Sequence, residues 1–193
     1  MGRGVRRFVL LSSSRLEPGG PMMGEVHAWL AKSASEWAVL RPSWFMQNFS
    51  EGPHAATIRE EGIIYTATGA GRVGFIDAED IAAAAAASLT ATTPLNSDVV
   101  LTGPDALSYD DTAAIITAAL GRPVRHVSLD PAALAARFVA QGLRSDYAGM
   151  LAGLDADIAS GAEDRTTLGV EQVTGQRPTS FRAFANRVLE TWT

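Results

Sequence analysis

The 193-residue chain contains no cysteine, which excludes disulfides, thiolate catalysis and cysteine-based metal sites. It also lacks an excess of basic residues, because 16 Lys and Arg stand against 21 Asp and Glu and the formal net charge is −5. Nucleic-acid binding needs a basic stripe, so it is not expected here. No apolar run approaches the roughly 18 residues of a membrane span. Without disulfides or a membrane segment, the simplest expected location is cytoplasmic.

Short apolar runs predict buried strands. Residues 6–12 (RFVLLSS), 37–40 (WAVL) and 98–102 (DVVLT) have the continuous apolar character of strands in a parallel sheet. Helix-compatible segments separate them, and the strand–helix–strand order predicts an α/β fold in which these strands are parallel neighbours. Arg41-Pro42 is expected to stop the second strand, because proline cannot donate to a ladder.

The remaining chain continues the alternation of strands and helices. Serine, aspartate and glycine at expected helix ends supply the capping chemistry. Further strands are expected at 63–66, at Phe75-Ile76 and at 124–129, and helices at 22–35, in part of 44–61, from Asp77 or Asp80 to 89, from 108 to 120, within 131–161 and from Ser180, with 163–179 irregular. In the first helix, Met23, Val26, His27 and Leu30 are expected to share one face.

Three serines, Ser12, Ser13 and Ser14, follow the first predicted strand. In open parallel sheets, ligands bind at the carboxyl ends of the strands, so hydroxyl groups here are candidates for contact with a ligand. Serine is also an ordinary residue for ending a strand and starting a turn. The residues alone leave both interpretations open.

The segment LRPSWFMQNF at 40–49 carries the most specific motif. Together with FIDAEDIA (75–82), LTGPDALSYDD (101–111), LGRPVRHV (120–127) and VTGQRPTSFRAFA (173–185), in that order, it resembles the NmrA-like, atypical branch of the short-chain dehydrogenase/reductase family. That branch includes quinone oxidoreductases, azoreductases and festuclavine-type ergot alkaloid dehydrogenases. The resemblance covers nearly all of residues 5–193.

The resemblance implies an α/β fold made of the C-terminal part of a Rossmann-type parallel sheet, at 1–103, and a small α/β substrate-binding lobe, at 104–193. In complete members, a GxxGxxG loop grips the pyrophosphate of the dinucleotide at a helix N-terminus. That loop is expected in an N-terminal half that this chain lacks. NADP or NAD is therefore the expected cofactor of a full-length parent, and tight binding to this chain alone is not expected.

The same resemblance assigns roles around the serines. Ser14 matches the family's catalytic serine, with Ser13 as the alternative and Ser12 beside them at the cofactor. The family's tyrosine acid falls on Met23, and methionine cannot transfer a proton. The lysine that follows it by four residues falls on His27, which is expected to bind the nicotinamide ribose and to act with Ser14.

The motif after the second strand supplies the other expected site residues. The backbone of Pro42, Ser43, Trp44 and Phe45 is expected to meet the nicotinamide carboxamide. The side chains expected to wall the substrate pocket are Met46, Asn48, Phe49 and Phe75. An aromatic cluster of this kind can equally be hydrophobic core.

Other patterns have ordinary structural interpretations. The G-x-G-x-x-G of Gly69–Gly74 leads into extended residues, whereas a dinucleotide loop leads into a helix, so a loop without cofactor is the better interpretation. The acidic residues at 77–80 begin a helix and are expected to cap it. His54 and His126 have no partners at metal-ligand spacing, and no metal is expected.

The resulting hypothesis is an NAD(P)H-dependent reductase of a small conjugated acceptor of the quinone, azo or iminium type. Such acceptors take hydride without a strong acid, which suits a site with Met23 in place of tyrosine. Two alternatives stay open: an NAD(P)-sensing regulator without catalysis, and a fragment that serves as an interaction module. The expected partners are a small-molecule substrate and a second chain, as a homo-oligomer or paired through an exposed sheet edge.

Overall fold

The computed structural model describes residues 4–193 and groups the chain into two compact units. The first unit takes the chain up to Phe45, together with Ile76–Pro104 and Thr166–Thr179. The second unit takes Met46–Phe75, Asp105–Arg165 and Ser180–Thr193. Neither unit is a single stretch of sequence, and the division at residue 103 that the sequence suggests stays a prediction.

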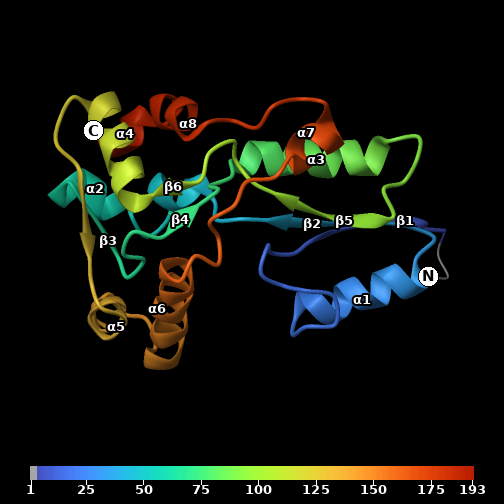
Figure 1. Cartoon of the computed structure of the whole chain (residues 1–193), viewed down its shortest axis with the longest axis horizontal. Coiled ribbons are helices and arrows are strands. Elements are labelled where there is room, and N and C mark those ends of the chain that lie inside the picture. Colours follow the sequence, from blue (N-terminus) through green and yellow to red (C-terminus); the bar gives the residue numbers. More distant parts are fainter. Residues whose placement is uncertain (1–3) are drawn as a thin grey trace. The chain divides into compact units, whose positions relative to one another are not determined.

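A three-stranded parallel sheet forms the centre of the first unit (Figure 1). Its strands are β1 (Arg7–Leu11), β2 (Glu36–Pro42) and β5 (Ser97–Leu101). β2 lies between the other two and pairs with both in parallel. This arrangement confirms the predicted sheet, including the neighbours of each strand.

The second strand is longer than predicted, because β2 runs through Arg41 and Pro42. Pro42 occupies the last position of the strand, where the lost N–H removes at most one ladder bond. Its carbonyl still accepts a hydrogen bond from the Ser14 N–H at 2.9 Å. The strand therefore stops at Pro42, two residues beyond the predicted bounds of 37–40, and Arg41 belongs to the sheet.

Helices cover both faces of this sheet. α1 (Met23–Ser33) lies against one face, and α3 (Ala78–Thr90) and α7 (Gly169–Thr174) lie against the other (Figure 1). α7 falls in the stretch expected to be irregular, so that expectation was wrong. A core of Leu40, Ile76, Ile81, Ala84, Leu101 and Val170 fills the space beneath α3 and α7. Asp77 caps α3 as predicted, accepting the Glu79 N–H at 3.1 Å.

The buried face of α1 differs from the predicted one. Gly24, His27 and Leu30 are buried, whereas Met23 and Val26 are 39% and 37% exposed. A Cβ atom on Gly24 would lie 2.6 Å from the carbonyl oxygen of Glu17. The glycine therefore allows the preceding loop to approach the helix closely, and this approach sets which side of α1 turns inward.

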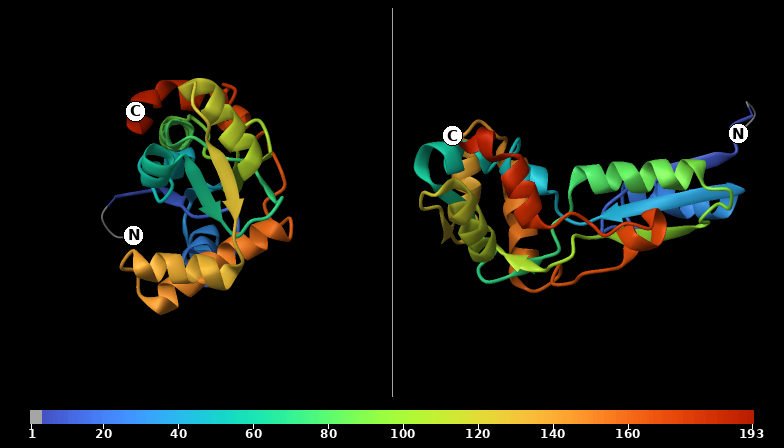
Figure 2. Two further views of the ribbon diagram at one scale, coloured as in Figure 1. Left: turned by 90° about the vertical axis from the view of Figure 1, so that its left-hand side faces the viewer. Right: turned by 90° about the horizontal axis from the view of Figure 1, so that it is seen from above.

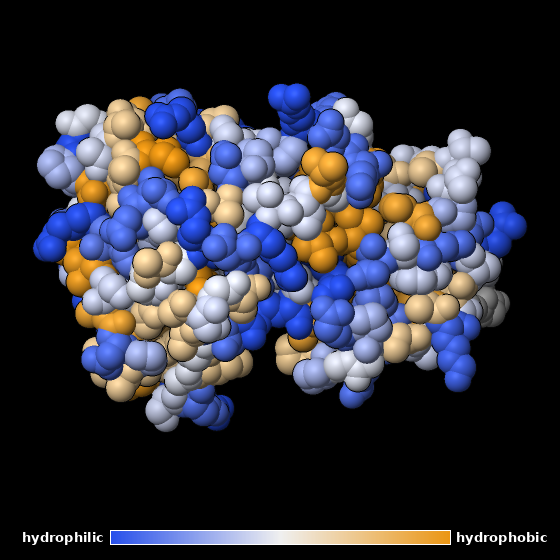
Figure 3. Space-filling view, viewed as in Figure 1, coloured by the Kyte–Doolittle hydropathy of each residue, from blue (hydrophilic) through white to orange (hydrophobic). Residues whose placement is uncertain are grey.

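The outer edge of β5 is closed by the segment that leads into α7. The Thr167 hydroxyl donates to the Val100 carbonyl at 2.6 Å, and the Thr167 N–H donates to the Thr102 hydroxyl at 2.8 Å. A Cβ atom on Gly169 would lie 2.2 Å from the Val100 carbonyl oxygen, so the contact requires glycine. A shallow groove with apolar side chains, including Val99 and Val173, remains along this edge, where Figure 3 shows a hydrophobic patch.

The second unit is built around two short parallel strands, β3 (Ile63–Thr66) and β7 (Arg125–Ser128), which lie side by side in Figure 2. An antiparallel pair, β4 (Arg72–Val73) and β6 (Leu107–Ser108), belongs to the same unit. The remaining elements are η1 (Met46–Phe49), α2 (Ala55–Glu61), β4 (Arg72–Val73), β6 (Leu107–Ser108), α4 (Tyr109–Leu120), α5 (Pro131–Ala140), α6 (Ser145–Ala159), α8 (Phe181–Arg187) and η2 (Leu189–Trp192). No helix within residues 4–193 is long and apolar enough to cross a membrane.

The glycine-rich segment Gly69–Gly74 is packed between elements of the second unit. It contains strand β4 and is followed by the extended residues Phe75 and Ile76, whereas a dinucleotide loop passes into a helix. A Cβ atom on Gly71 would lie 2.2 Å from the carbonyl oxygen of Ile158, at the end of α6. The glycine thus serves a close backbone contact, which gives the motif a structural explanation.

We expect Gly71→Ala and Gly169→Ala each to lower the free energy of unfolding by about 1–3 kcal/mol, because each methyl group would collide with a backbone carbonyl. Gly149→Ala is the matched control, since nothing lies within 4 Å of its added Cβ in the middle of α6. The control should raise stability by about 0.4–1 kcal/mol. Urea denaturation of the three variants measures this, and equal stability of all three would contradict the packing.

Candidate functional site

The carboxyl ends of the three parallel strands in the first unit are tied together by backbone hydrogen bonds. The Ser12 N–H donates to Leu40 at 2.8 Å, and the Ser14 N–H donates to Pro42 at 2.9 Å. The Ser43 N–H donates to Leu101 at 2.9 Å. The segments that follow β1 and β2 therefore lie together at the carboxyl end of the sheet, as predicted, and ligands bind at this end in open parallel sheets.

Two buried polar atoms at this sheet have no hydrogen-bond partner within the described residues: Ser12 Oγ and His27 Nδ1. His27 is 2% exposed, and its ring lies 5.9 Å from the ring of Trp37. Ser14 is 3% exposed. Buried polar groups without partners are uncommon and costly, so each atom marks a position where a ligand or water belongs. No printed contact joins the two positions, because Ser12 follows the last residue of β1 whereas His27 lies beside Trp37, the second residue of β2.

The Arg41 side chain organises the loop after β1. Its guanidinium group donates to the Ser14 carbonyl at 3.0 Å and to the Ser13 carbonyl at 3.4 Å. It also forms ion pairs with Asp98, at 2.7 Å, and with Glu17. The Arg41 side chain is 7% exposed. Burial is the largest single influence on its pKa and lowers it, but the hydrogen bonds and charges of Asp98 and Glu17 together outweigh burial, so the pKa is raised. Arg41 was not among the predicted site residues, although its motif was.

The segment from Pro42 to Phe45 continues from the sheet edge. Pro42 and Ser43 are buried, while Trp44 and Phe45 are half-buried. The Trp44 carbonyl accepts the Ile76 N–H at 2.9 Å, and Phe45 forms a parallel bridge with Ile76. These bonds fix the backbone at Trp44 and Phe45. Contact between this backbone and the nicotinamide carboxamide, which the sequence suggests, stays a prediction.

The four residues predicted to wall a substrate pocket lie in the second unit. Met46, Phe49 and Phe75 are at most 1% exposed, and Asn48 is half-buried. The Phe49 ring contacts those of Phe75, at 5.3 Å, and Phe181, at 4.9 Å. These side chains contribute to an aromatic core, and their contact with a substrate stays a prediction.

Sequence reasoning missed two further residues of the second unit, Tyr109 and Asp155. Tyr109 begins α4 after the cap residue Ser108, is 2% exposed, and contacts the Phe75 ring at 5.4 Å. Asp155 lies on α6 and accepts the Ala67 N–H at 2.8 Å. Burial raises the pKa of Asp155 to about 6, although the bond from Ala67 opposes this shift. Its place three residues from each of the apolar residues Ala152 and Ile158 was the available signal.

Two histidines surround Tyr109. The His54 and His126 rings lie 5.6 Å and 5.7 Å from the Tyr109 ring. Burial, and then the nearby His126, lower the pKa of His54 to about 4, so His54 is neutral at pH 7. His126 Nε2 shares a 2.7 Å hydrogen bond with the Thr66 hydroxyl. No group of three or more metal-binding side chains was found among residues 4–193.

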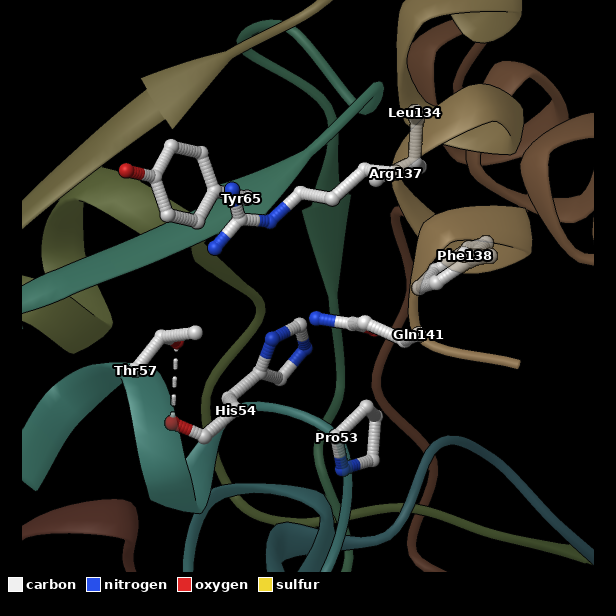
Figure 4. A pocket seen from close by; sticks show the side chains of 8 residues that line it. All are labelled: Pro53, His54, Thr57, Tyr65, Leu134, Arg137, Phe138 and Gln141. Carbon is white, nitrogen blue, oxygen red and sulfur yellow. Dashed lines mark hydrogen bonds between the residues drawn. The ribbon is translucent and has the colours of Figure 1, made fainter. Parts of the chain in front are cut away.

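A small pocket lies beside His54 (Figure 4). The Arg137 guanidinium group stacks over the Tyr65 ring at 3.7 Å, and the Thr57 hydroxyl donates to the His54 carbonyl at 3.2 Å. The volume of the pocket is about 10 Å³, which leaves room for roughly one water molecule. The pocket is therefore too small for an organic substrate as it stands.

No family model matches the chain. It is 45% identical over 194 residues to agroclavine dehydrogenase of Claviceps fusiformis, covering 98% of the chain and 67% of that protein. It is 45% identical over 190 residues to the uncharacterized oxidoreductase YesF of Bacillus subtilis, covering 98% and 66%. An NAD(P)H azoreductase of Xenophilus azovorans is 34% identical, with coverage of 94% and 65%. The chain thus spans about two thirds of the length of these relatives.

Solved structures share the fold. The NADPH-dependent quinone oxidoreductase QOR2 of Escherichia coli, complexed with NADPH, matches with a TM-score of 0.82 at 24% identity, covering 96% of this chain and 66% of that one. The negative transcriptional regulator NmrA, in complex with NAD, matches with a TM-score of 0.69 at 13% identity, covering 96% and 65%. At these identities the likeness concerns the fold alone.

We expect Arg41→Met to lower the free energy of unfolding by about 1–3 kcal/mol, because the Ser13 and Ser14 carbonyls lose a charged donor. Trypsin should also cut faster after Arg15, in the loop that Arg41 holds. Arg144→Met is the control, because its ion pair with Asp146 is exposed at the surface and should matter little. Equal digestion of both variants and the parent chain would show that Arg41 does not order the loop.

The raised pKa of Asp155 predicts a pH dependence of stability. The pKa of the Asp155 carboxyl group is about 6 in the folded chain, against an ordinary value of 3.8. The protonated group therefore makes its full contribution to the stability of the folded state below pH 3.8, and this contribution is lost as the pH rises through 6. Asp155→Asn should therefore be more stable than the parent chain at pH 7.5 by roughly 1–2 kcal/mol. Thermal melting at several pH values should show this advantage shrinking toward pH 4, and a constant difference would contradict the assignment.

Proposed function

The chain belongs to the NmrA-like branch of the short-chain dehydrogenase/reductase family, and on that premise we propose that it reduces a small, conjugated, electron-poor organic acceptor with NAD(P)H. The acceptor class comprises quinones, azo compounds and iminium ions. The observation that carries the proposal is the 45% identity to a dehydrogenase across 98% of the chain. The azoreductase relative and the quinone oxidoreductase fold support the same chemistry.

The sheet edge of the first unit suits a nicotinamide nucleotide. Ser12 Oγ and His27 Nδ1 are buried without described partners, and the hydroxyl and amide groups of such a nucleotide could satisfy both. Ser12, Ser13, His27 and the backbone of Pro42–Phe45 are the residues that would hold it. When bound, NAD(P)H supplies the hydride.

The chain's own residues set the character of the reduction. Met23 stands where the family's tyrosine acid is expected, and its side chain has no proton to give. Ser14, held at the sheet edge by its N–H bond to Pro42, is the residue proposed to donate a hydrogen bond to the acceptor. A site without a strong acid favours acceptors whose reduced form is stable before it is protonated.

A second candidate function is an NAD(P)-sensing regulator that turns nothing over. The fold shared with the transcriptional regulator NmrA and the absence of the tyrosine acid favour it. The two candidates differ in one measurable property, because a sensor binds NAD(P)H without consuming it.

We expect NAD(P)H oxidation when a full-length protein that contains this chain is mixed with a panel of quinone, azo and iminium acceptors, and little or none with the 193-residue chain alone. Ser14→Ala should lower kcat modestly, since one hydroxyl hydrogen bond contributes about 0.5–1.5 kcal/mol. His27→Ala should mainly raise the KM for NAD(P)H. A chimaeric polypeptide, in which the third of YesF that this chain does not match is fused to it, should oxidise NAD(P)H with the same acceptors. Tight NADPH binding with no oxidation across the panel would favour the sensor instead.

We also expect the 193-residue chain alone to bind NAD(P)H weakly. Its glycine-rich segment contains β4 and continues into extended residues, so this segment offers no helix N-terminus to a pyrophosphate. The outer edge of β1 pairs with no other strand among the described residues, and we propose that it self-associates or pairs with another segment. Titration calorimetry giving micromolar affinity would refute the first proposal. Light scattering showing only monomer would refute self-association.

A further inference from the structure

Helix α1 carries apolar side chains on both of its faces. Leu30 and the ring of His27 are buried toward the sheet. The opposite side leaves four large apolar side chains in solvent, namely Met22, Met23, Val26 and Trp29, which are 69%, 39%, 37% and 53% exposed. Apolar side chains all round a helix are typical of a helix that is covered on both sides.

Three of these side chains form one stripe. Met22, Val26 and Trp29 follow one another at intervals of four and three residues, which places them on the same side of α1. Of the described helices in the first unit, α1 alone lies on its face of the sheet, so no helix of that unit covers the stripe (Figure 1). Exposed tryptophans are frequent anchors of protein interfaces, so the stripe has the character of a docking surface.

Two charged residues flank this α1 stripe. Glu25 and Lys32 are seven residues apart, or roughly 10 Å along the helix axis, so they lie on the same flank with Trp29 between them. Both are exposed, and neither side chain forms a hydrogen bond or an ion pair within residues 4–193. The flank therefore presents a negative charge toward its N-terminal end and a positive charge toward its C-terminal end.

We propose that the α1 stripe is the surface on which two copies of this chain pair, with the two α1 helices antiparallel. A twofold axis perpendicular to both helices reverses the second helix and brings the same flank of each helix together. Glu25 of each copy then faces Lys32 of the other, and the two Trp29 side chains meet near the centre.

The charges select the antiparallel arrangement. In a parallel pair, whose twofold axis runs along the helices, the flank with Glu25 and Lys32 would face the other flank of the second helix. That flank carries Val26 and Ser33, so all four charges would lack partners. The antiparallel pair satisfies every one of them, and the surface is therefore complementary to itself in that direction alone.

The α1 stripe is small for a protein interface. α1 has 11 residues, so the contact lies toward the low end of stable interfaces and a dissociation constant in the micromolar range is expected. The stripe is a helix face and is separate from the outer edge of β1. The inference also does not depend on the reductase function.

Sedimentation velocity of the 193-residue chain across the micromolar range tests the proposal, and a monomer–dimer equilibrium is the expected result. Glu25→Lys and Lys32→Glu each turn two attractive pairs of the dimer into two repulsive ones. Each should raise the dissociation constant about tenfold or more. Glu51→Lys, the same change at an exposed position in the second unit, is the matched control and should leave the constant unchanged.

Two rescue experiments separate pairing from misfolding. The double variant Glu25→Lys/Lys32→Glu exchanges the charges and restores both attractive pairs, so its dissociation constant should return to within about threefold of the parent value. An equimolar mixture of the two single variants should form a heterodimer, because one chain then carries two lysines on the flank and the other two glutamates.

The apolar part of the contact has its own test. Trp29→Ala should raise the dissociation constant about tenfold or more, since a tryptophan at the centre of an interface carries much of the binding energy. Tyr147→Ala is the control, because Tyr147 is an aromatic residue of similar exposure, 52%, on α6 of the second unit. The control should associate as the parent chain does.

A chain that stays monomeric at every concentration would overturn the proposal. So would a dimer that both charge reversals leave unchanged, because the contact would then lie elsewhere, for example at the outer edge of β1. Association that the single variants lose and that neither the double variant nor the mixture restores would equally contradict it. None of these results bears on the reductase function, which NAD(P)H oxidation decides.

Discussion

The ion-pair network of Arg41 is the interaction on which the first unit's candidate site depends. The guanidinium group of Arg41, on β2, pairs with Glu17 in the loop after β1 and with Asp98 on β5. It also donates to the two loop carbonyl groups of Ser13 and Ser14. A lysine could not replace Arg41 here. Its ammonium group is a compact point charge with three N–H donors, whereas two carboxylates and two carbonyl groups surround the guanidinium group. The network fixes the loop that carries Ser13 and Ser14, and Gly24 then lets α1 approach that loop. The Ser12 hydroxyl oxygen and the His27 ring are buried in the same unit.

The features that were predictable from the sequence are those that local residues determine. Continuous apolar runs gave the three strands of the first sheet, and their order along the chain gave the parallel pairing. Asp77, Ser108 and Gly121 mark helix ends because capping requires only a side chain or a left-handed residue within a few positions. The family likeness was readable for the same reason, since short motifs in a fixed order survive without knowledge of contacts.

The features that were missed depend on residues far apart in the sequence. The face that α1 buries follows from a contact between Gly24 and the Glu17 carbonyl, which periodicity does not report. α7 begins against the Val100 carbonyl, and Gly169 provides the room for this contact between segments far apart in the sequence. Asp155 lies 88 residues from Ala67, whose N–H donates a hydrogen bond to it, so no local pattern linked Asp155 to the end of β3. Phe49 and Phe75, which the sequence assigns to a substrate pocket, pack together with Phe181, and their contact with a substrate stays a prediction.

The two units each place an ionisable residue at the carboxyl end of parallel strands, but the residues are compensated differently. Arg41 is surrounded by two carboxylates and two carbonyls, so its charge is satisfied within the protein and serves the fold. Asp155 receives one backbone N–H and no cation from the described residues, so its charge is costly when the protein stands alone. A carboxyl group avoids this cost by staying protonated, and desolvation accordingly raises the pKa of Asp155 to about 6. The contrast separates an ion pair whose charge is compensated within the fold from a carboxyl group that gains or loses its proton near pH 6.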